Sequence, residues 1–482
     1  MTGETGNPKV LIVASEGLPF IKTGGLADVV GTLPKALKEL GVETRVMMPL
    51  HAQIKQEYGA ELKTEASVMI KLGWREKYLG LVSLEKDGVT WYFIDNEDYF
   101  TGGIYRGGDA ENEQYLFFCK AVCEALLLLD FKPDVLHLND WHTGLIPLLV
   151  KTQYAGRYEN EKKLLFTIHN IEFQGKMDFG LMKDMLSLPD FYNTPEYVEA
   201  GGCANMLKAA LVFADRISTV SPNYAKEILH PWFGLGMEGI LSARQHELSG
   251  IINGIDTKVF NPETDEAIPA NFSAANLTGK RACKSALRTE FSLDIKLSVP
   301  IISMVSRLTG QKGFDLVQHV LEELLQEDIA FVILGSGEKK YEEFFNHIAA
   351  KYPSKTGVYI GYNEPLAHRI YAGSDFLLMP SEYEPCGLSQ MIAQRYGTLP
   401  IVRETGGLAD TVAPYNMYTK DGTGFGFSTF NAHDMMGATR LALSVYADKK
   451  VLRKLRKNAM LTDNDFLKSA AQYKELYEEI IC

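Results

Sequence analysis

The chain has 482 residues, of which 49 are basic and 61 are acidic, and its formal net charge is -12. This length exceeds what one hydrophobic core usually supports, so the sequence predicts two domains. The negative charge argues against nonspecific binding to nucleic acid or to an anionic membrane surface, but it is compatible with a local basic pocket for a charged small molecule.

Six cysteines are scattered through the sequence without any C-x-x-C pair. This distribution is typical of reduced intracellular thiols rather than of a disulfide framework or a zinc site. The first ten residues lack the basic and apolar regions of an export signal, and no apolar run approaches the ~20 residues that a membrane span needs. We therefore expect a cytoplasmic protein.

Strand-like and helix-like segments alternate through the first half, which predicts a parallel sheet with helices on both faces. The expected strands are residues 10–15, 45–48, 90–94, 164–168 and 216–221, with an insertion that contains 68–73 and 82–84. We place the join between the domains just after the glycine-broken segment that contains Asn253 and Gly254.

A glycine-rich loop, KTGGLADVV, follows the first expected strand and leads into a helix-like pattern. Gly24 and Gly25 let the backbone approach a ligand closely, and Lys22 adds a positive charge, so the loop is suited to a diphosphate. The sequence is neither a Walker loop nor G-x-G-x-x-G, and a purely structural glycine turn is the alternative.

Polar residues also follow two later strands of this half. They are His137, Asn139, Asp140, Trp141 and His142 on one strand, and His169, Asn170 and Gln174 on the next. The carboxyl ends of parallel strands are where α/β sheets bind ligands, so we expect Asp140, His169 and Asn170 at a site. A zinc site is the less favoured interpretation, because no histidines have H-x-x-x-H spacing.

A second series of strands begins near Val299, and its first loop carries Arg307 and Lys312. Two cations at the end of a strand are well spaced to bind a diphosphate, the arginine as a fork and the lysine as a point charge. Tyr362 follows a later strand and could stack on a base, with core packing as the alternative.

Residues 376–412 predict the order strand, loop, helix, strand, loop and helix. Their sequence is FLLMPSEYEPCGLSQMIAQRYGTLPIVRETGGLADTV. Each loop leaves backbone N–H groups at a helix start, where anions are favoured. The first loop adds the carboxylate of Glu384 beside Cys386, and the second contains Thr405. A carboxylate beside a phosphate site suits a ligand with both phosphate and hydroxyl groups.

Eight motifs occur in the order KTGGLADVV, NDWHTGL, TIHN, INGID, SRLTGQKG, LGSGE, PSEYEPCGLSQ and TGGLADTV. In these motifs the chain resembles the bacterial glycogen synthases and plastid starch synthases along almost its full length. The resemblance implies the GT-B fold, with two Rossmann-like doubly wound α/β domains facing each other across a deep cleft. It implies an N-terminal domain of residues 1–254, a C-terminal domain of 255–457, and a helix of 458–482 that crosses back to the first domain.

The resemblance also implies transfer of glucose from ADP-glucose to the 4-hydroxyl of an α-1,4-glucan (glycogen or a maltooligosaccharide), with retention and without a metal or other cofactor. Neither nucleic acid nor a membrane is an expected partner. Catalytic roles would fall to Glu384, His169, Arg307, Lys312 and Asp140. Substrate-binding roles would fall to Lys22, Gly24, Gly25, Asn170, Asn253, Tyr362, Cys386, Gly387, Leu388 and Thr405. In these roles Arg307 and Lys312 would neutralise the leaving diphosphate, and Glu384 would bind glucosyl hydroxyls.

Two positions depart from related patterns. Many GT-B transferases carry a second glutamate where this chain has Ile392, an absence that glycogen and starch synthases commonly share. The C-terminal tail is two residues shorter than the family's usual version. The alternatives are another GT-B transferase that uses UDP-glucose, such as a sucrose or trehalose-phosphate synthase, and a noncatalytic glucan-binding homologue.

Overall fold

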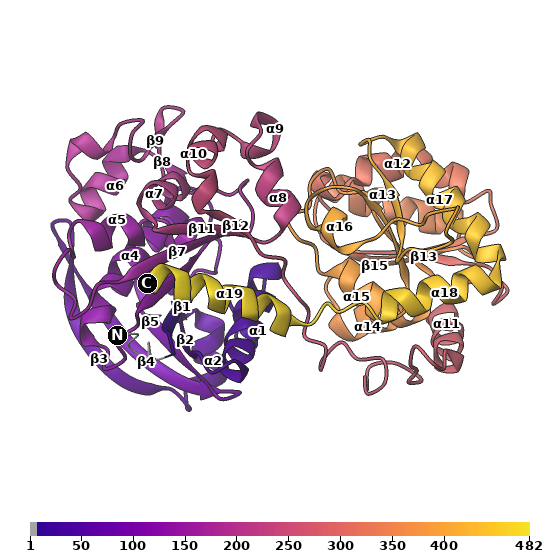
Figure 1. The fold of residues 1–482 in the computed structure, drawn as a ribbon, viewed down its shortest axis with the longest axis horizontal. Helices are drawn as coiled ribbons and strands as arrows, with labels where there is room; N and C mark the ends of the chain where they lie inside the picture. Colours follow the sequence, from indigo (N-terminus) through magenta and orange to yellow (C-terminus); the bar gives the residue numbers. More distant parts are fainter. Residues whose placement is uncertain (1–6) are drawn as a thin grey trace. The chain divides into compact units, whose positions relative to one another are not determined.

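A computed structural model describes residues 7–482, which form two compact units (Figure 1). Unit 1 extends to Asn253 and also includes Phe466–Cys482, and unit 2 comprises Gly254–Asp465. The first six residues, on which the absence of an export signal was partly argued, lie outside the described residues.

Unit 1 is built on a nine-stranded sheet with the strand order β12-β11-β7-β6-β1-β2-β5-β4-β3. The seven strands from β12 to β5 are parallel. The nine strands are β1 (Lys9–Val13), β2 (Glu43–Pro49), β3 (Lys63–Leu72), β4 (Arg75–Lys86), β5 (Val89–Asp95), β6 (Val135–Asn139), β7 (Lys163–Ile168), β11 (Arg216–Thr219) and β12 (Leu248–Gly250).

The insertion at 68–84 departs from the expected all-parallel sheet. β3 and β4 form a long antiparallel hairpin, and β4 pairs antiparallel with β5, so the hairpin extends one edge of the sheet. In β3 the more buried residues alternate with exposed ones, as in a strand with one exposed face, which explains its broken apolar pattern. The second half of β4 is buried on both sides, with Leu79 and Leu81 in one core and Leu84 in the other.

Alternating residues of β1 serve two separate cores. Leu11 and Val13 pack with α4 (Gly108–Leu128), α5 (Ile146–Lys151) and α7 (Met206–Phe213), whereas Val10 and Ile12 pack with α1 (Gly25–Glu39) and α19 (Phe466–Ile481). A strand buried on both faces has a continuous apolar sequence, which is what KVLIV shows.

The last helix, α19, belongs to unit 1 and lies beside α1 in Figure 1. Tyr477 donates or accepts a 2.8 Å hydrogen bond with His137 Nδ1, and Lys474 Nζ donates to the carbonyl of Leu40 at 3.0 Å. The expected start at residue 458 is wrong, because α18 (Lys449–Met460) buries its apolar face in the core of unit 2 and α19 begins only at Phe466.

Unit 2 has a six-stranded parallel sheet with the order β15-β14-β13-β16-β17-β18. Numbered within the unit, this is the doubly wound order 3-2-1-4-5-6, which reverses direction between β13 and β16. The strands are β13 (Ile301–Val305), β14 (Ala330–Gly335), β15 (Thr356–Ile360), β16 (Phe376–Met379), β17 (Leu399–Arg403) and β18 (Phe425–Phe427).

Helices cover both faces of this sheet. One face packs against α12 (Phe314–Leu324), α13 (Lys339–Lys351), α17 (Ala432–Ala447) and α18, and the other against α11 (Thr278–Glu290) and α14 (Glu364–Gly373). Two short helices, α15 (Ser389–Arg395) and α16 (Gly406–Thr411), follow β16 and β17.

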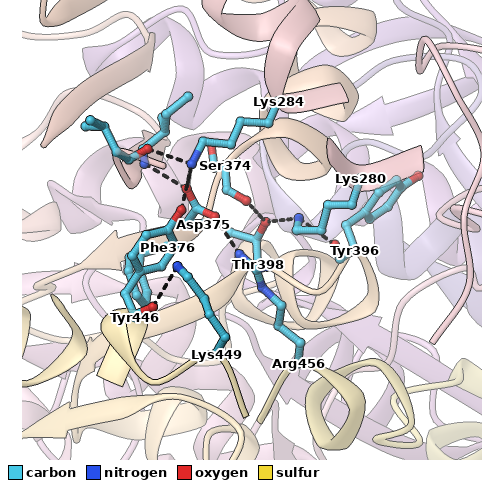
Figure 2. A network of polar contacts seen from close by, with 12 residues as sticks. Lys280, Lys284, Ser374, Asp375, Phe376, Tyr396, Thr398, Tyr446, Lys449 and Arg456 are labelled. Atoms are coloured by element: carbon cyan, nitrogen blue, oxygen red, sulfur yellow. Dashed lines mark hydrogen bonds and ion pairs between the residues drawn. The ribbon is translucent and has the colours of Figure 1, made fainter. Parts of the chain in front are cut away.

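A buried polar network ties helices α11 and α18 to the amino ends of the strands in unit 2 (Figure 2). Asp375, which directly precedes β16, accepts from Lys284 Nζ and from the guanidinium of Arg456 at 2.5 Å each. Lys280 Nζ donates to the carbonyl of Tyr396 and to Thr398 Oγ1 at 2.8 Å each. The carboxyl ends of the strands are thereby left as the edge available for a ligand.

Candidate active site

In unit 2 the predicted residues gather at the carboxyl ends of β13 and β16, where the strand order reverses. Arg307 and Lys312 lie in the loop after β13, and Glu384, Cys386 and their neighbours lie in the loop after β16. A crevice at such a reversal is the usual ligand site of a doubly wound sheet.

The centre of this half-site is a buried ion pair between Lys312 and Glu384. Lys312 Nζ lies 2.9 Å from Oε1 and 2.6 Å from Oε2 of Glu384, and Ser381 Oγ donates to Oε2 at 2.9 Å. Both side chains are largely buried, with 15% and 6% of their areas exposed. The structure therefore brings together two residues that the sequence separates by 72 positions, and it fixes the carboxylate through both oxygens.

The two loops of residues 376–412 pack directly against each other. Gly407 N donates to the carbonyl of Glu384 at 3.0 Å. A Cβ on Gly406, whose φ is +45°, would lie 1.9 Å from that same carbonyl oxygen, so only glycine fits there. The expectation that the second loop leaves its N–H groups open to an anion is wrong for Gly407, because the backbone of the first loop already accepts from it.

The remaining predicted residues of unit 2 differ in accessibility. Arg307 is exposed, and within residues 7–482 no carboxylate pairs with its guanidinium. Tyr362 follows β15 and is 70% exposed. Cys386 and Thr405 are buried, and α15 begins at Ser389, two residues after Gly387, whose φ is +74°.

In unit 1 the second half-site is formed by the residues that follow β6 and β7. Asp140 Oδ1 accepts from the backbone N of His169 at 2.7 Å and of Asn170 at 3.3 Å. Asn139 was not among the predicted site residues, yet its Oδ1 lies 2.9 Å from His169 Nε2, while its Nδ2 donates to the carbonyl of Val13 at 3.1 Å. Asn139 therefore orients the histidine.

The electrostatics of this half-site are set by burial. Burial raises the pKa of Asp140 to about 7, an effect that the two backbone N–H groups partly oppose, and it lowers the pKa of His169 to about 3. His169 is therefore neutral at pH 7. Because Nε2 donates to Asn139, Nδ1 of the neutral ring is left as an acceptor. Asp140 also has φ = +56°, a conformation that non-glycine residues adopt mainly where structure demands it.

The glycine loop of unit 1 leads into α1, with Gly24 at the N-cap position and no side-chain cap. Lys22 is not isolated: its Nζ lies 2.7 Å from Asp28 Oδ1. A second acid, Glu16, accepts hydrogen bonds from the backbone N and the hydroxyl of Thr23. Neither acid was predicted as a site residue, although Glu16 directly follows the first expected strand, residues 10–15, and Asp28 lies within the KTGGLADVV motif.

Asn253 is buried at the end of unit 1, where the two units join in sequence. Within residues 7–482 no group of three or more His, Cys, Asp or Glu side chains is arranged to hold a metal ion. The same residues contain no helix long and apolar enough to cross a membrane.

Two doubly wound units, with cations and a carboxylate at the strand reversal of one and polar residues at the carboxyl edge of the other, define a GT-B glycosyltransferase. Residues 9–243 match the family described as "Starch synthase catalytic domain", and residues 287–461 match "Glycosyl transferases group 1". The chain is 48% identical to the glycogen synthases of Geobacillus thermodenitrificans and Geobacillus stearothermophilus, over 98% of each sequence. It belongs to the glycogen and starch synthase family.

Solved structures agree with this assignment. The catalytic domain of starch synthase IV from Arabidopsis thaliana, bound to ADP and acarbose, has a TM-score of 0.91 and 31% identity, with 98% of this chain and 99% of that chain covered. Sucrose-phosphate synthase from Thermosynechococcus elongatus has a TM-score of 0.63 at 16% identity, which shows a shared fold alone. The predictions of the GT-B fold and of the family are confirmed.

Proposed function

We propose that this protein transfers glucose from ADP-glucose to the 4-hydroxyl at the non-reducing end of an α-1,4-glucan. The observation that carries the proposal is the Lys312–Glu384 pair at the strand reversal of unit 2, because a cation beside a carboxylate at a ligand edge is suited to a ligand with both phosphate and hydroxyl groups. The relatives named glycogen synthase, and the starch synthase bound to ADP and acarbose, support this choice of substrates.

In unit 2, Arg307 would bind the diphosphate as a fork and Lys312 as a point charge. Glu384 would accept hydrogen bonds from glucosyl hydroxyls, and Tyr362 would stack on the adenine. The backbone around Cys386, Gly387 and Leu388, together with Thr405, would hold the sugar and its phosphate. Negative charge grows on the departing ADP, so stabilisation by the two cations would be the largest contribution to catalysis.

In unit 1, Lys22, Gly24 and Gly25 would lie near the distal phosphate. His169, Asn170 and Asn253 would bind the glucosyl group, with Nδ1 of neutral His169 accepting from a hydroxyl. Asp140 would lie toward the acceptor glucan. Its Oδ1 already accepts from two backbone N–H groups, which suits a role in holding this half-site together.

We propose a front-face reaction with retention of configuration. The bond from glucosyl C1 to the ADP oxygen breaks, the acceptor O4 bonds to C1 on the same face, and the acceptor proton passes to the leaving phosphate oxygen. Double displacement would need a free carboxylate as nucleophile. Glu384 is poorly suited to that role, because Lys312 binds both of its oxygens.

The proposed reaction needs no metal, and we propose the cytoplasm as its location. These two points rest on the family resemblance.

ADP-glucose and UDP-glucose should be compared at equal concentrations with glycogen as acceptor, by measuring nucleoside diphosphate release. The proposal expects a strong preference for ADP-glucose. A preference for UDP-glucose would overturn the choice of donor, and glycogen binding without transfer from either donor would identify a noncatalytic glucan-binding protein.

A further inference from the structure

Glu16 is a buried carboxylic acid beneath the Lys22–Gly25 loop of unit 1. It is 2% exposed and follows β1 by three residues. A single carboxyl oxygen, Oε2, accepts from both the backbone N of Thr23 at 2.5 Å and Thr23 Oγ1 at 2.6 Å. One side chain therefore fixes the residue between Lys22 and Gly24.

These bonds determine how the loop enters α1. Gly17 and Ile21 exchange two backbone hydrogen bonds of 3.1 Å, which close the five residues between Glu16 and Lys22 into a compact turn. The contact from Glu16 to Thr23 spans that turn and holds its far end, directly before the N-cap Gly24. Because α1 has no side-chain cap, the bonds from Thr23 to Glu16 hold the segment in front of the helix together with Leu18 N, which donates to the carbonyl of Ala27 at 3.0 Å, and the Lys22–Asp28 pair.

The charges around Glu16 are unfavourable for an additional anion. The acids coupled to Glu16 are Asp28 of α1 and Asp140 after β6. Tyr105, before α4, and Tyr115 of α4 also face it, but burial raises the pKa of both phenols, so they are neutral at pH 7 and offset no negative charge. Lys22, the only cation of the loop, is paired with Asp28. Ionised Glu16 would therefore give the loop a net negative charge at the place proposed for a phosphate.

We propose that Glu16 is the positioning residue of the phosphate loop in unit 1, holding its shape through Thr23 and doing so as the neutral acid when the donor diphosphate is bound. The carbonyl oxygen of a neutral carboxyl still accepts both bonds from Thr23, while the negative charge is removed. Burial raises the pKa of Glu16 to about 7, partly opposed by the bonds from Thr23, so the proton is available near neutral pH. The identity of the ligand rests on the proposed function.

Two readouts separate this role from a merely structural one. The KM for ADP-glucose of the unmodified protein should rise by up to ~10-fold per pH unit above pH 7, as one proton is lost. Glu16→Gln keeps an acceptor oxygen but cannot ionise, so its KM should stay within about 3-fold of the pH 6.5 value from pH 6.5 to 8.5. Glu16→Ala should raise KM by about 10-fold with little change in kcat, and Thr23→Val, which loses only the hydroxyl bond, should have a smaller effect.

Asp215 provides a matched control. Its carboxylate also accepts from a backbone N–H, that of Leu164 at 2.8 Å, but it lies at the amino end of β7 on the same sheet. Asp215→Asn should change neither the KM for ADP-glucose nor its dependence on pH. Thermal unfolding of each variant identifies any that fails to fold, and Glu16→Gln and Thr23→Val retain enough of the contact to be informative if Glu16→Ala fails.

Proton uptake can be measured directly by calorimetric titration of the whole protein with ADP-glucose, without glucan, in buffers of different ionisation enthalpy. The expected result is about half a proton taken up at pH 7, and none in Glu16→Gln. Uptake that is absent in the unmodified protein, or unchanged in Glu16→Gln, would overturn the role of Glu16. Failure of the unmodified protein to transfer glucose from ADP-glucose at any pH would instead overturn the proposed function.

Discussion

Removal of the ammonium group from the Lys312–Glu384 pair tests the central structural feature of unit 2. Lys312→Met keeps most of the side-chain volume but leaves Glu384 buried with Ser381 Oγ, at 2.9 Å, as its remaining side-chain donor. Breaking a buried ion pair from one side costs ~3–5 kcal/mol. Because Ser381 still donates a hydrogen bond to one oxygen of Glu384, we expect the lower value: unit 2 should lose about 3 kcal/mol of stability.

The distribution of tryptophan makes this effect measurable in one unit at a time. All four tryptophans, at positions 74, 91, 141 and 232, belong to unit 1. Tryptophan fluorescence therefore follows unit 1, whereas far-UV circular dichroism follows both units. For a domain the size of unit 2, a loss of 3 kcal/mol lowers Tm by about 6–12 °C. The variant should lower the midpoint of a circular dichroism transition without moving the fluorescence transition.

An exposed lysine of the same unit is the control. Lys340 Nζ lies 3.6 Å from Asp315 and 3.5 Å from Glu338, with 54% of its side chain exposed, so Lys340→Met should leave the circular dichroism transition almost unmoved. The double variant Lys312→Met with Glu384→Gln should recover most of the lost stability. Equal transitions for Lys312→Met and Lys340→Met would refute the assignment of a tightly coupled buried pair.

Four further outcomes are expected. Arg307→Ala should lower kcat by about 10²–10³-fold, and Arg307→Lys should restore only part of it; equal loss in both would show that charge is not what matters. Alkylation of Cys386 should be slow because the thiol is buried and should slow further with ADP-glucose, so equal labelling rates with and without donor would contradict its placement. Dialysis against EDTA should leave the transfer rate unchanged, and restoration of a lost rate by Mg²⁺ would contradict metal independence. The unfolding free energy of unit 1, followed by tryptophan fluorescence, should fall as the pH drops from 6.5 to 5, with a slope that steepens to ~2.7 kcal/mol per pH unit near pH 5, and a flat profile would contradict the pKa directions.

The sign of that pH dependence follows from six buried groups. Burial lowers the pKa of four histidines of unit 1 to about 3 or 4, so their stabilising effect is present above pH 6.5 and is lost as the pH falls. These histidines are His51, His137, His142 and His169. Burial raises the pKa of Glu16 and Asp140 to about 7, and their stabilising effect is lost as the pH rises. Near pH 5 the unfolded chain thus binds about four protons more at the histidines and about two fewer at the carboxyls, whereas at pH 6.5 the histidines of the unfolded chain are only half protonated.

Much of the fold could be predicted because the apolar runs of a buried parallel sheet are nearly continuous in sequence. The expected strand Phe376 to Met379 coincides with β16, and the glycines at 406 and 407 are required by the loop that packs against them. The β3–β4 hairpin was not predicted as one antiparallel element, because one face is exposed and breaks its apolar pattern. The start of α19 was misplaced because α18 has an equally clear apolar face, buried in unit 2.

The sequence predicted the candidate site residues one by one, but it did not predict which of them contact each other. Lys312 and Glu384 were each expected to face a ligand, and their contact with each other depends on the crossing of two chain segments 72 residues apart. Asn139 and Glu16 were missed for the same reason: each contacts a predicted site residue or a neighbour of one, and only the folded sheet creates that contact. A polar residue at the end of a buried strand or shortly after it was the available signal for both.

The most direct test of the proposed reaction is carbon NMR of the product formed from ADP-glucose labelled with ¹³C at glucosyl C1 and unlabelled maltohexaose. We predict that the label appears in an α-1,4-linked residue at the non-reducing end, with release of one ADP for each glucose transferred. Label in a β-linkage would contradict retention and the front-face mechanism. Release of ADP without labelled glucan, or no consumption of ADP-glucose, would contradict the account as a whole.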